Sequence, residues 1–423
     1  MNHFQYRDGT LHAEDVPLPL IAREVGTPFY VYSAATLRRH VRVFAEPFEG
    51  LDHLVAYAMK ANSNQAVLKL LAREGCGADI VSLGELRRAL AAGIDPAKIL
   101  FSGVGKRADE MDAALAAGIA CFNVESEPEL ERLSARAVAA GRDAPVSFRI
   151  NPDVDARTHW KISTGRKADK FGIPFEDASR IYARAAELPG IEVVGIDMHI
   201  GSQITDLDPF DAAFARLSDL VEQLRGEGHR IDHVDLGGGL GIPYAADNTP
   251  PPDPQAYGRV VRSHVEKLGV KLVFEPGRLI VGNAGVFVCR VEYVKETEAK
   301  SFVIVDGAMN DLIRPTLYEA FHEVRPVDES VSRRERLQGD VVGPVCESGD
   351  YLARDRDLPG FREGELMAFG SAGAYGAVQS GTYNSRPLVP EVLVDGDRFA
   401  TVRPRAPLED LLALDHVPDW LEG

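Results

Sequence analysis

The fold of this chain is constrained most by a regular alternation of two patterns between residues 53 and 278. Short apolar runs, typical of buried strands, alternate with helical stretches rich in Ala, Leu, Glu and Arg. The predicted strands span residues 53–59, 78–82, 99–102, 121–124, 146–150, 193–200, 233–236 and 272–274. Eight strands that alternate with helices predict an α/β fold, a parallel (β/α)8 barrel of the TIM type, with a doubly wound open sheet as the alternative.

Polar or glycine-rich residues follow almost every predicted strand. They are Lys60, Ser82, Gly103, Glu125, Asn151 and the segments 199–202, 237–241 and 275–278. In a barrel all of these residues lie on one rim, at the carboxyl ends of the strands, where barrel enzymes carry their chemistry. This arrangement favours the barrel over the open sheet and predicts an active site at that rim.

The alternation ends after Arg278, and β-rich runs punctuated by Gly and Pro take its place. These runs span residues 286–294, 301–305, 365–369 and 390–394. They predict a mostly antiparallel β domain. We expect the barrel to cover residues 35–278 and the β domain to combine residues 1–34 with 279–423.

Composition limits the class of protein and its partners. A length of 423 residues suits two domains, and a net charge of −17 argues against nucleic acid because no basic excess is present to replace counterions. The four cysteines, Cys76, Cys121, Cys289 and Cys346, have no paired spacing, which predicts a reducing compartment and no structural zinc. No apolar run approaches the length of a membrane span, so we expect a cytoplasmic protein with no membrane partner.

Lys60 lies where the first barrel strand is predicted to end, in the stretch Tyr57-Ala58-Met59-Lys60-Ala61-Asn62. A lysine at the mouth of a buried strand is costly unless it is paired or used chemically. Desolvation lowers the pKa of a lysine amine and favours Schiff-base chemistry with a carbonyl. The alternative is an ordinary solvated lysine at a strand end.

Two loops at the last strands predict a phosphate site. Segment 237–241 reads Gly-Gly-Gly-Leu-Gly, and segment 275–278 reads Glu-Pro-Gly-Arg. Glycines let backbone N–H groups approach an anion closely, and barrels often build a phosphate site from the last two strand loops. The alternative for a glycine run alone is a tight turn.

His199 and Ser202 follow the sixth predicted strand. A histidine there is either a hydrogen-bonded core residue or a side chain that stacks on a flat ligand, with Ser202 donating to phosphate. A metal is not expected, because no His, Asp or Glu cluster has ligand spacing. Together with a Schiff-base lysine, a phosphate cradle and an acid at Glu275, these residues predict a site for pyridoxal 5′-phosphate.

The chain resembles the diaminopimelate decarboxylase family, whose pyridoxal-phosphate barrel is of the alanine racemase type. The resemblance covers nearly the whole length. It rests on Thr158, His159 and on segments 57–62, 149–152, 161–165, 170–173, 199–203, 235–241, 275–278, 306–318, 343–350, 373–376 and 383–386. It implies decarboxylation of meso-2,6-diaminopimelate to L-lysine and CO2, the last step of lysine biosynthesis. In this reaction the substrate forms a Schiff base on the cofactor, CO2 leaves a ring-stabilised carbanion, and Cys346 protonates it.

The resemblance also implies a role for each site residue. Lys60 carries the cofactor, His199 stacks on its ring, and Glu275 pairs with the pyridine nitrogen. The remaining cofactor-binding residues are Ser202, Gly238, Gly239, Pro276, Gly277, Arg278 and Tyr375. The substrate-binding residues are Arg278, Arg314, Tyr318, Glu347 and Tyr375. Since Cys346 and Glu347 come from the neighbouring subunit in the family, the resemblance implies a homodimer with shared active sites.

Other interpretations remain open from the sequence alone. The chain could be a related decarboxylase that acts on ornithine, arginine or carboxynorspermidine, although ornithine has no distal carboxylate for Arg314 to hold. An amino-acid racemase is disfavoured by the acid at Glu275, and a non-catalytic pyridoxal phosphate carrier is disfavoured by the β domain. A structural barrel without cofactor is the last alternative. Segment 155–170 carries a local basic excess and is either a lid over the site or a solvated loop.

Overall fold

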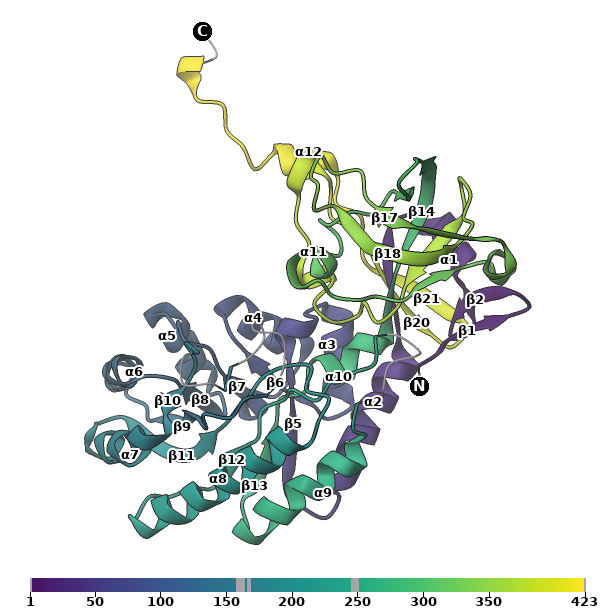
Figure 1. Ribbon diagram of the computed structural model, residues 1–423. Coiled ribbons are helices and arrows are strands. Elements are labelled where there is room, and N and C mark those ends of the chain that lie inside the picture. The colour runs from purple at the N-terminus through teal and green to yellow at the C-terminus, as the bar shows by residue number, and fades with distance from the viewer. Residues whose placement is uncertain (1, 157–163, 166–168, 245–250, 422–423) are drawn as a thin grey trace. The chain divides into compact units, whose positions relative to one another are not determined.

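The computed structural model describes residues 2–156, 164–165, 169–244 and 251–421. The chain divides into two compact units (Figure 1). The barrel unit comprises Arg38–Pro243 and Thr249–Ile280, and the β unit comprises Met1–Leu37, Tyr244–Asn248 and Val281–Gly423. Each unit is described below by itself.

In the described part of the barrel unit, eight parallel strands form a closed ring. They are β5 (His53–Ala58), β6 (Gly77–Ile80), β7 (Ile99–Phe101), β8 (Cys121–Val124), β9 (Ala144–Asn151), β11 (Ile191–Asp197), β12 (His233–Asp235) and β13 (Lys271–Phe274). The last strand pairs with the first, Leu272 opposite His53, and this pairing closes the barrel. The predicted (β/α)8 barrel is confirmed. The sixth strand ends at Asp197, three residues earlier than predicted, and His199 therefore lies in the loop after it.

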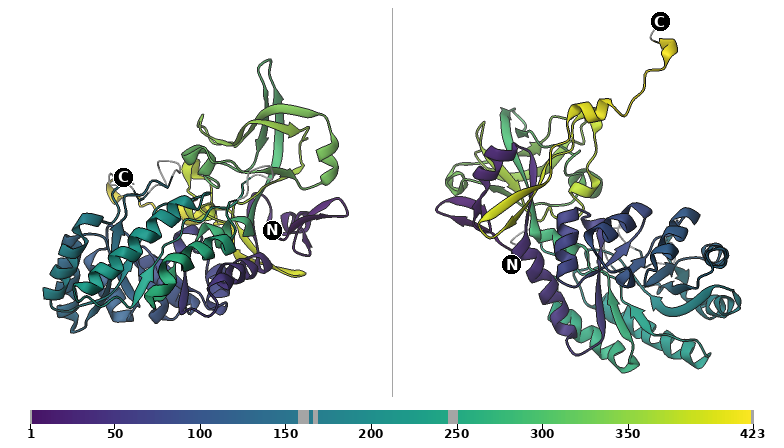
Figure 2. Two further views of the ribbon diagram at one scale, coloured as in Figure 1. Left: turned by 60° about the horizontal axis from the view of Figure 1, so that its bottom comes forward. Right: turned by 180° about the vertical axis from the view of Figure 1, so that it is seen from behind.

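Helices connect these strands and surround them in all three views (Figures 1 and 2). They are α2 (Ala34–Ala45), α3 (Gln65–Arg73), α4 (Leu83–Ala92), α5 (Ala108–Ala117), α6 (Glu127–Ala140), α7 (Ala178–Glu187), α8 (Asp208–Gly226), α9 (Pro254–Val265) and α10 (Arg278–Val281). The Ser82 side chain caps the first turn of α4, and Gly93 ends that helix with a left-handed backbone. A short strand, β10 (Ile173–Pro174), pairs with the end of β9.

The strands of the barrel carry apolar and polar side chains at different positions along their length. Leu54, Ala56, Leu100, Cys121 and Val273 form a buried apolar cluster. Toward the carboxyl ends, the strands also carry buried residues that are polar or charged: Asp79, Asn123, Ser147, Arg149, Asp197 and Asp235. Buried polar groups need hydrogen-bond or charge partners, so this end of the barrel is where a site is expected.

The β unit is built on one large sheet. It contains β4 (Phe29–Ser33), β14 (Gly285–Glu296), β15 (Ser301–Val305), β16 (Val324–Pro326), β17 (Arg336–Val342), β18 (Tyr351–Pro359), β19 (Leu366–Phe369), β20 (Glu391–Asp395) and β21 (Arg398–Arg403). The main path runs β18-β17-β15-β14-β4-β20-β21, and β15–β17 and β20–β4 are its parallel pairings. The predicted mostly antiparallel character is therefore confirmed.

Smaller elements complete the β unit. A separate sheet contains β1 (Phe4–Arg7), β2 (Thr10–Ala13) and β3 (Val16–Pro17). The helices are α1 (Leu18–Val25), α11 (Arg314–Tyr318) and α12 (Leu408–Leu412). Across the described residues of both units, no helix has the length and apolar character needed to cross a membrane.

Candidate active site

Lys60 lies in a short 3₁₀ turn, Met59–Ala61, directly after β5. Its Nζ is 2.9 Å from Oδ2 of Asp79, a side chain on β6 with no exposed surface. The lysine side chain is 38% exposed. A buried carboxylate therefore holds the amine at the open end of the barrel, where a small molecule can reach it.

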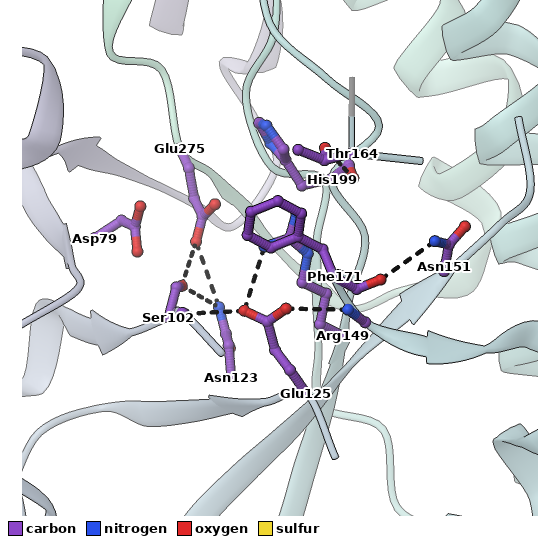
Figure 3. Close-up of polar contacts among 12 residues, drawn as sticks. Asp79, Ser102, Asn123, Glu125, Arg149, Asn151, Thr164, Phe171, His199 and Glu275 are labelled. Atoms are coloured by element: carbon purple, nitrogen blue, oxygen red, sulfur yellow. Dashed lines mark hydrogen bonds and ion pairs between the residues drawn. The ribbon is translucent and has the colours of Figure 1, made fainter. Parts of the chain in front are cut away.

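Glu275 follows β13 and is only 5% exposed. The Ser102 hydroxyl and the Asn123 amide each donate a hydrogen bond to its Oε1 at 3.3 Å (Figure 3). Burial, followed by the charges of Asp235, Asp79 and Asp197, raises the pKa of Glu275 well above its ordinary value. A positive charge or a strong hydrogen-bond donor placed against Glu275 would stabilise its ionised form and lower this pKa.

Glu275 belongs to a group of three buried acids, the one such group found among the described residues. One carboxylate oxygen each from Asp197, Asp235 and Glu275 lies within 4.8 Å of the others. Burial raises the pKa of Asp235 to about 7, although the Gly237 N–H donates to its Oδ1. Burial and the charge of Asp235 likewise raise the pKa of Asp197. Like charges this close do not all ionise, so the group holds protons near neutral pH.

His199 lies beside the same end of the barrel (Figure 3). Its Nδ1 accepts a hydrogen bond from the Gly238 N–H at 3.1 Å, which leaves the ring proton on Nε2. Burial, and then the positive charges of Arg149 and Lys60, lower the pKa of His199 well below its ordinary value. The ring is therefore neutral and fixed in orientation, as a side chain that stacks on a flat ring needs to be.

The glycine-rich loop after β12 packs against its neighbours through bare backbone. A Cβ atom on Gly238 would lie 2.3 Å from the Glu275 carbonyl oxygen, and one on Gly239 would lie 2.5 Å from the Gly201 carbonyl oxygen. Gly239 also has φ +105°. Only glycine fits these positions, so the three loops that follow β11, β12 and β13 approach each other closely.

Arg278 and Ser202 add polar side chains to these glycine-rich loops. The Arg278 guanidinium donates to the Ser202 hydroxyl from Nη2 at 3.0 Å. Gly277, next to Arg278, leaves room for Ala58, which precedes the lysine turn, and for Ala61, which ends it. Backbone amides, a hydroxyl and a guanidinium on one set of loops suit a phosphate group, and the phosphate site stays a prediction.

Sequence reasoning placed Glu125 at the rim and Arg149 in a matched segment, but it assigned neither residue a role in this site. Arg149, on β9, donates to Glu125 at 3.4 Å and stacks on the Phe171 ring at 4.9 Å (Figure 3). Glu125 also accepts the backbone N–H groups of Gly103 and Gly172 at 3.0 Å each, so it ties three rim loops together. The signal that could have revealed Arg149 was a charged residue within an otherwise apolar strand.

In the β unit, Arg314 is 6% exposed. Its Nη1 donates to Nε2 of His322 at 2.9 Å, and Nδ1 of His322 donates to the Gly370 carbonyl at 2.8 Å. This pairing fixes His322 as the neutral tautomer. The guanidinium carbon also lies 4.7 Å from the Tyr244 ring centroid. The arginine charge is therefore rigidly oriented and suits recognition of a carboxylate.

Cys346 and Glu347 are both exposed, on the loop between β17 and β18. Two backbone N–H groups, of Val345 and Met309, donate to the Asp350 carboxylate and hold this loop. The Cys346 N–H donates to Asn384 at 3.0 Å. The other three cysteines are buried, so Cys346 is the accessible thiol of the chain.

Tyr318 and Tyr375 are half-buried in the same unit. Tyr375 has φ +55°, a left-handed backbone that is unusual for a bulky residue. The predicted lid, 155–170, lies largely outside the described residues, and it stays a prediction. The functional roles of all the predicted site residues also stay predictions, and are taken up below.

Comparisons with known proteins decide the family. Residues 34–282 match the family model described as the pyridoxal binding domain of pyridoxal-dependent decarboxylases. The diaminopimelate decarboxylase of Pseudomonas aeruginosa is 54% identical over 413 residues, covering 98% of each chain. The chain belongs to the diaminopimelate decarboxylase family. It is thus a pyridoxal-phosphate-dependent decarboxylase, and the predicted cofactor is confirmed.

Other family members agree with this assignment. The Vibrio cholerae diaminopimelate decarboxylase is 52% identical, covering 99% of each chain. The crystal structure of diaminopimelate decarboxylase from M. jannaschii in co-complex with L-lysine superposes with a TM-score of 0.94, at 36% identity over the full length of both chains. The lysine/ornithine decarboxylase of Vibrio vulnificus, at 21% identity and a TM-score of 0.79, shares the fold.

Proposed function

We propose that this enzyme decarboxylates meso-2,6-diaminopimelate to L-lysine and CO2 in the cytoplasm, as the last step of lysine biosynthesis. The observation that carries the proposal is the gathering of Lys60, His199 and Glu275 at one end of the barrel beside a glycine-lined cradle. The substrate follows from relatives that are named diaminopimelate decarboxylase and are 43–54% identical. Two solved members, from Helicobacter pylori and M. jannaschii, are complexes with L-lysine.

The bound cofactor supplies an aldehyde that condenses with amines and a protonated pyridine ring that accepts the electron pair left when a bond to Cα breaks. Lys60 provides the amine that holds the cofactor, and Asp79 positions that amine. Glu275 holds the proton on the pyridine nitrogen, a role that suits a buried acid among other acids. The neutral His199 ring stacks on the cofactor.

The loops after β11, β12 and β13 bind the phosphate group of the cofactor. Backbone N–H groups of Gly239 and Gly277 would bind it, with Ser202 and Arg278 alongside, while Gly238 takes part through the close packing of its loop, since its own N–H donates to His199. Pro276 lies between Glu275 and Gly277, and its carbonyl accepts the Ala58 N–H at 3.3 Å. This contact ties the phosphate loop to the end of the strand that carries Lys60.

Residues of the β unit bind the substrate. Meso-diaminopimelate has an amino-carboxylate at each end, so its unreacting end needs a cation for the carboxylate and an anion for the ammonium. Arg314 and Glu347 supply this pair, and Tyr318 and Tyr375, with Arg278 of the barrel unit, complete the contacts. The Cys346 thiol donates its proton to Cα after CO2 has left.

The proposed active enzyme is a homodimer in which Cys346 and Glu347 serve the partner's barrel. A two-fold dimer then has two equivalent composite sites. Mixing inactive Lys60→Ala and Cys346→Ala chains tests this arrangement. Random exchange at equal amounts makes about half of all dimers heterodimers, each with one intact site of two, so activity recovers to roughly a quarter of wild type.

The control is the Cys346→Ala homodimer, which must first be severely impaired, since water can replace a proton donor in part. If verified exchange restores no activity, the shared site is wrong. The substrate is tested by carbon dioxide release from meso-diaminopimelate, LL-diaminopimelate, ornithine and lysine in parallel. Preference for ornithine or lysine would overturn the proposed substrate.

A further inference from the structure

The C-terminal segment 407–421, called the arm here, exposes an unusual run of apolar side chains. Leu408, Leu412, Leu414, Val417, Trp420 and Leu421 are between 51% and 81% exposed. The arm also carries Glu409, Asp410, Asp415 and Asp419, and has no lysine or arginine. Single exposed apolar residues are normal on a protein surface, but a run of this kind marks an interaction surface.

The arm has little packing that would support its own structure, because only Leu411 and Pro418 are partly buried. Its helix α12 has five residues and none is buried, and the 3₁₀ turn Asp419–Leu421 buries none either. Isolated helices shorter than about 12 residues are marginal in water, so most helical stability comes from packing against another surface. Figure 1 shows the part of the arm that follows α12 running away from the strands of its own unit. Its apolar side chains therefore need a surface that this copy of the β unit does not provide.

The β unit carries a second exposed surface with complementary chemistry. This α11 patch consists of Leu317 and Phe321 at and after α11, and Tyr351, Arg354 and Arg356 on the adjacent strand β18. Leu317 is 38% and Phe321 is 42% exposed. The Arg356 guanidinium carbon lies 3.4 Å from the Phe321 ring centroid, and that of Arg354 lies 5.6 Å from the Tyr351 ring centroid.

Arg356 is half-buried, yet within the described part of the chain no carboxylate lies within ion-pair distance of it. Arg354 is 62% exposed, and its ion-pair partner is the neighbouring Asp355 at 3.7 Å. Arginines stacked on aromatic rings, beside exposed apolar side chains, suit a segment that presents both carboxylates and leucines. The arm presents both.

We propose that the arm of one copy docks on the α11 patch of a second copy, and that the second copy's arm docks reciprocally. Both surfaces belong to one chain, and both are exposed in a single copy, so two-fold symmetry would bury two equal contacts. Arg356, which has no ion pair within the described residues, supplies the positive charge for the acidic arm, while the exposed acids Glu319 and Asp355 occur in the same two segments of the patch. This inference rests on the proposed homodimer and adds the contact that secures it.

The first test follows Trp420 as a reporter. The chain has two tryptophans, Trp160 and Trp420, so Trp160→Phe leaves Trp420 as the only one. Trp420 is 79% exposed in a single copy. Fluorescence emission is measured over a dilution series in which sedimentation velocity gives the dimer fraction. We expect the emission to shift to shorter wavelength, and acrylamide quenching to fall, in step with dimer formation.

A dimer whose Trp420 stays water-exposed overturns the docked arm and leaves the homodimer intact. A monomer at every concentration overturns both, and a monomer with a shielded Trp420 means that the arm folds back on its own chain. The chain truncated after Ala406 is expected to raise the dimer dissociation constant at least about tenfold. An unchanged constant in a folded truncation overturns the proposal.

Charge exchange tests the patch itself. Arg356→Glu is expected to weaken the dimer at least about tenfold, and adding Glu409→Arg and Asp410→Arg to the same chain restores most of the loss. The matched control is Arg398→Glu, an exposed arginine on β21 of the same unit, which leaves the dimer unchanged. Failure of the exchanged charges to restore the dimer, while the truncation weakens it, overturns the α11 patch as the docking surface.

Discussion

The buried acids under the barrel rim make the stability of the cofactor-free enzyme depend on pH, and one substitution removes the part that Asp235 contributes. Asp235 is fully buried on β12, and its Oδ1 accepts the Gly237 N–H at 2.9 Å. Asp235→Asn keeps the shape and that acceptor but cannot ionise. We expect the variant to lose less stability than the wild type as the pH rises.

The sign follows from the raised pKa. Burial places the pKa of Asp235 at about 7 in the folded protein, against about 3.9 in an unfolded chain. The folded state therefore holds the proton more tightly, and this stability is fully present below pH 3.9 and is lost as pH rises through 7. Between pH 5 and pH 8 the linkage relation gives a loss of about 2–3 kcal/mol in the free energy of unfolding from this group.

The assay is urea unfolding of cofactor-free wild type and Asp235→Asn at pH 5, 6, 7 and 8. The wild-type free energy of unfolding, minus that of the variant, should fall by about 2–3 kcal/mol across this range. Asp219→Asn, an exposed position on α8, is the matched control and should run parallel to wild type. A wild-type-minus-variant difference that stays constant with pH would refute the reasoning, since Asp235 would then already be ionised in the folded state.

Three further predictions concern single side chains. Lys60→Ala should abolish the absorbance band of the lysine-bound cofactor and lower turnover by roughly three orders of magnitude or more; a variant that keeps both would end the assignment. Arg314→Lys should raise KM for meso-diaminopimelate by an amount worth roughly 1–3 kcal/mol; unchanged discrimination against lysine would make Arg314 structural. Lys106→Met breaks a buried ion pair with Glu129, 2.7 Å apart, and should cost about 3–5 kcal/mol of unfolding free energy, while Arg107→Met, beside it but in an exposed pair, should change little.

The sequence was sufficient for the barrel and for the residues that follow its strands. The carboxyl ends of parallel strands meet at one rim, so the order of strands alone predicts which loops are neighbours. Lys60, the glycine run and Glu275 could be placed in this way. Periodicity did not locate the end of the sixth strand, because Met198 and Ile200 are buried in the loop beyond it just as strand residues are. It also missed β17 and β18, whose exposed charged residues hide the strand pattern.

Only the tertiary structure decided which side chains act together. Asp197, Asp235 and Glu275 come from three strand ends far apart in the chain, and their shared protons depend on distances of a few ångströms in a buried space. The neutral state of His199 depends on one amide of the loop after β12, and the orientation of Arg314 depends on His322 and Tyr244. Sequence patterns fix the positions of elements through their periodicity, but charge states follow from burial and from neighbours that only folding brings together.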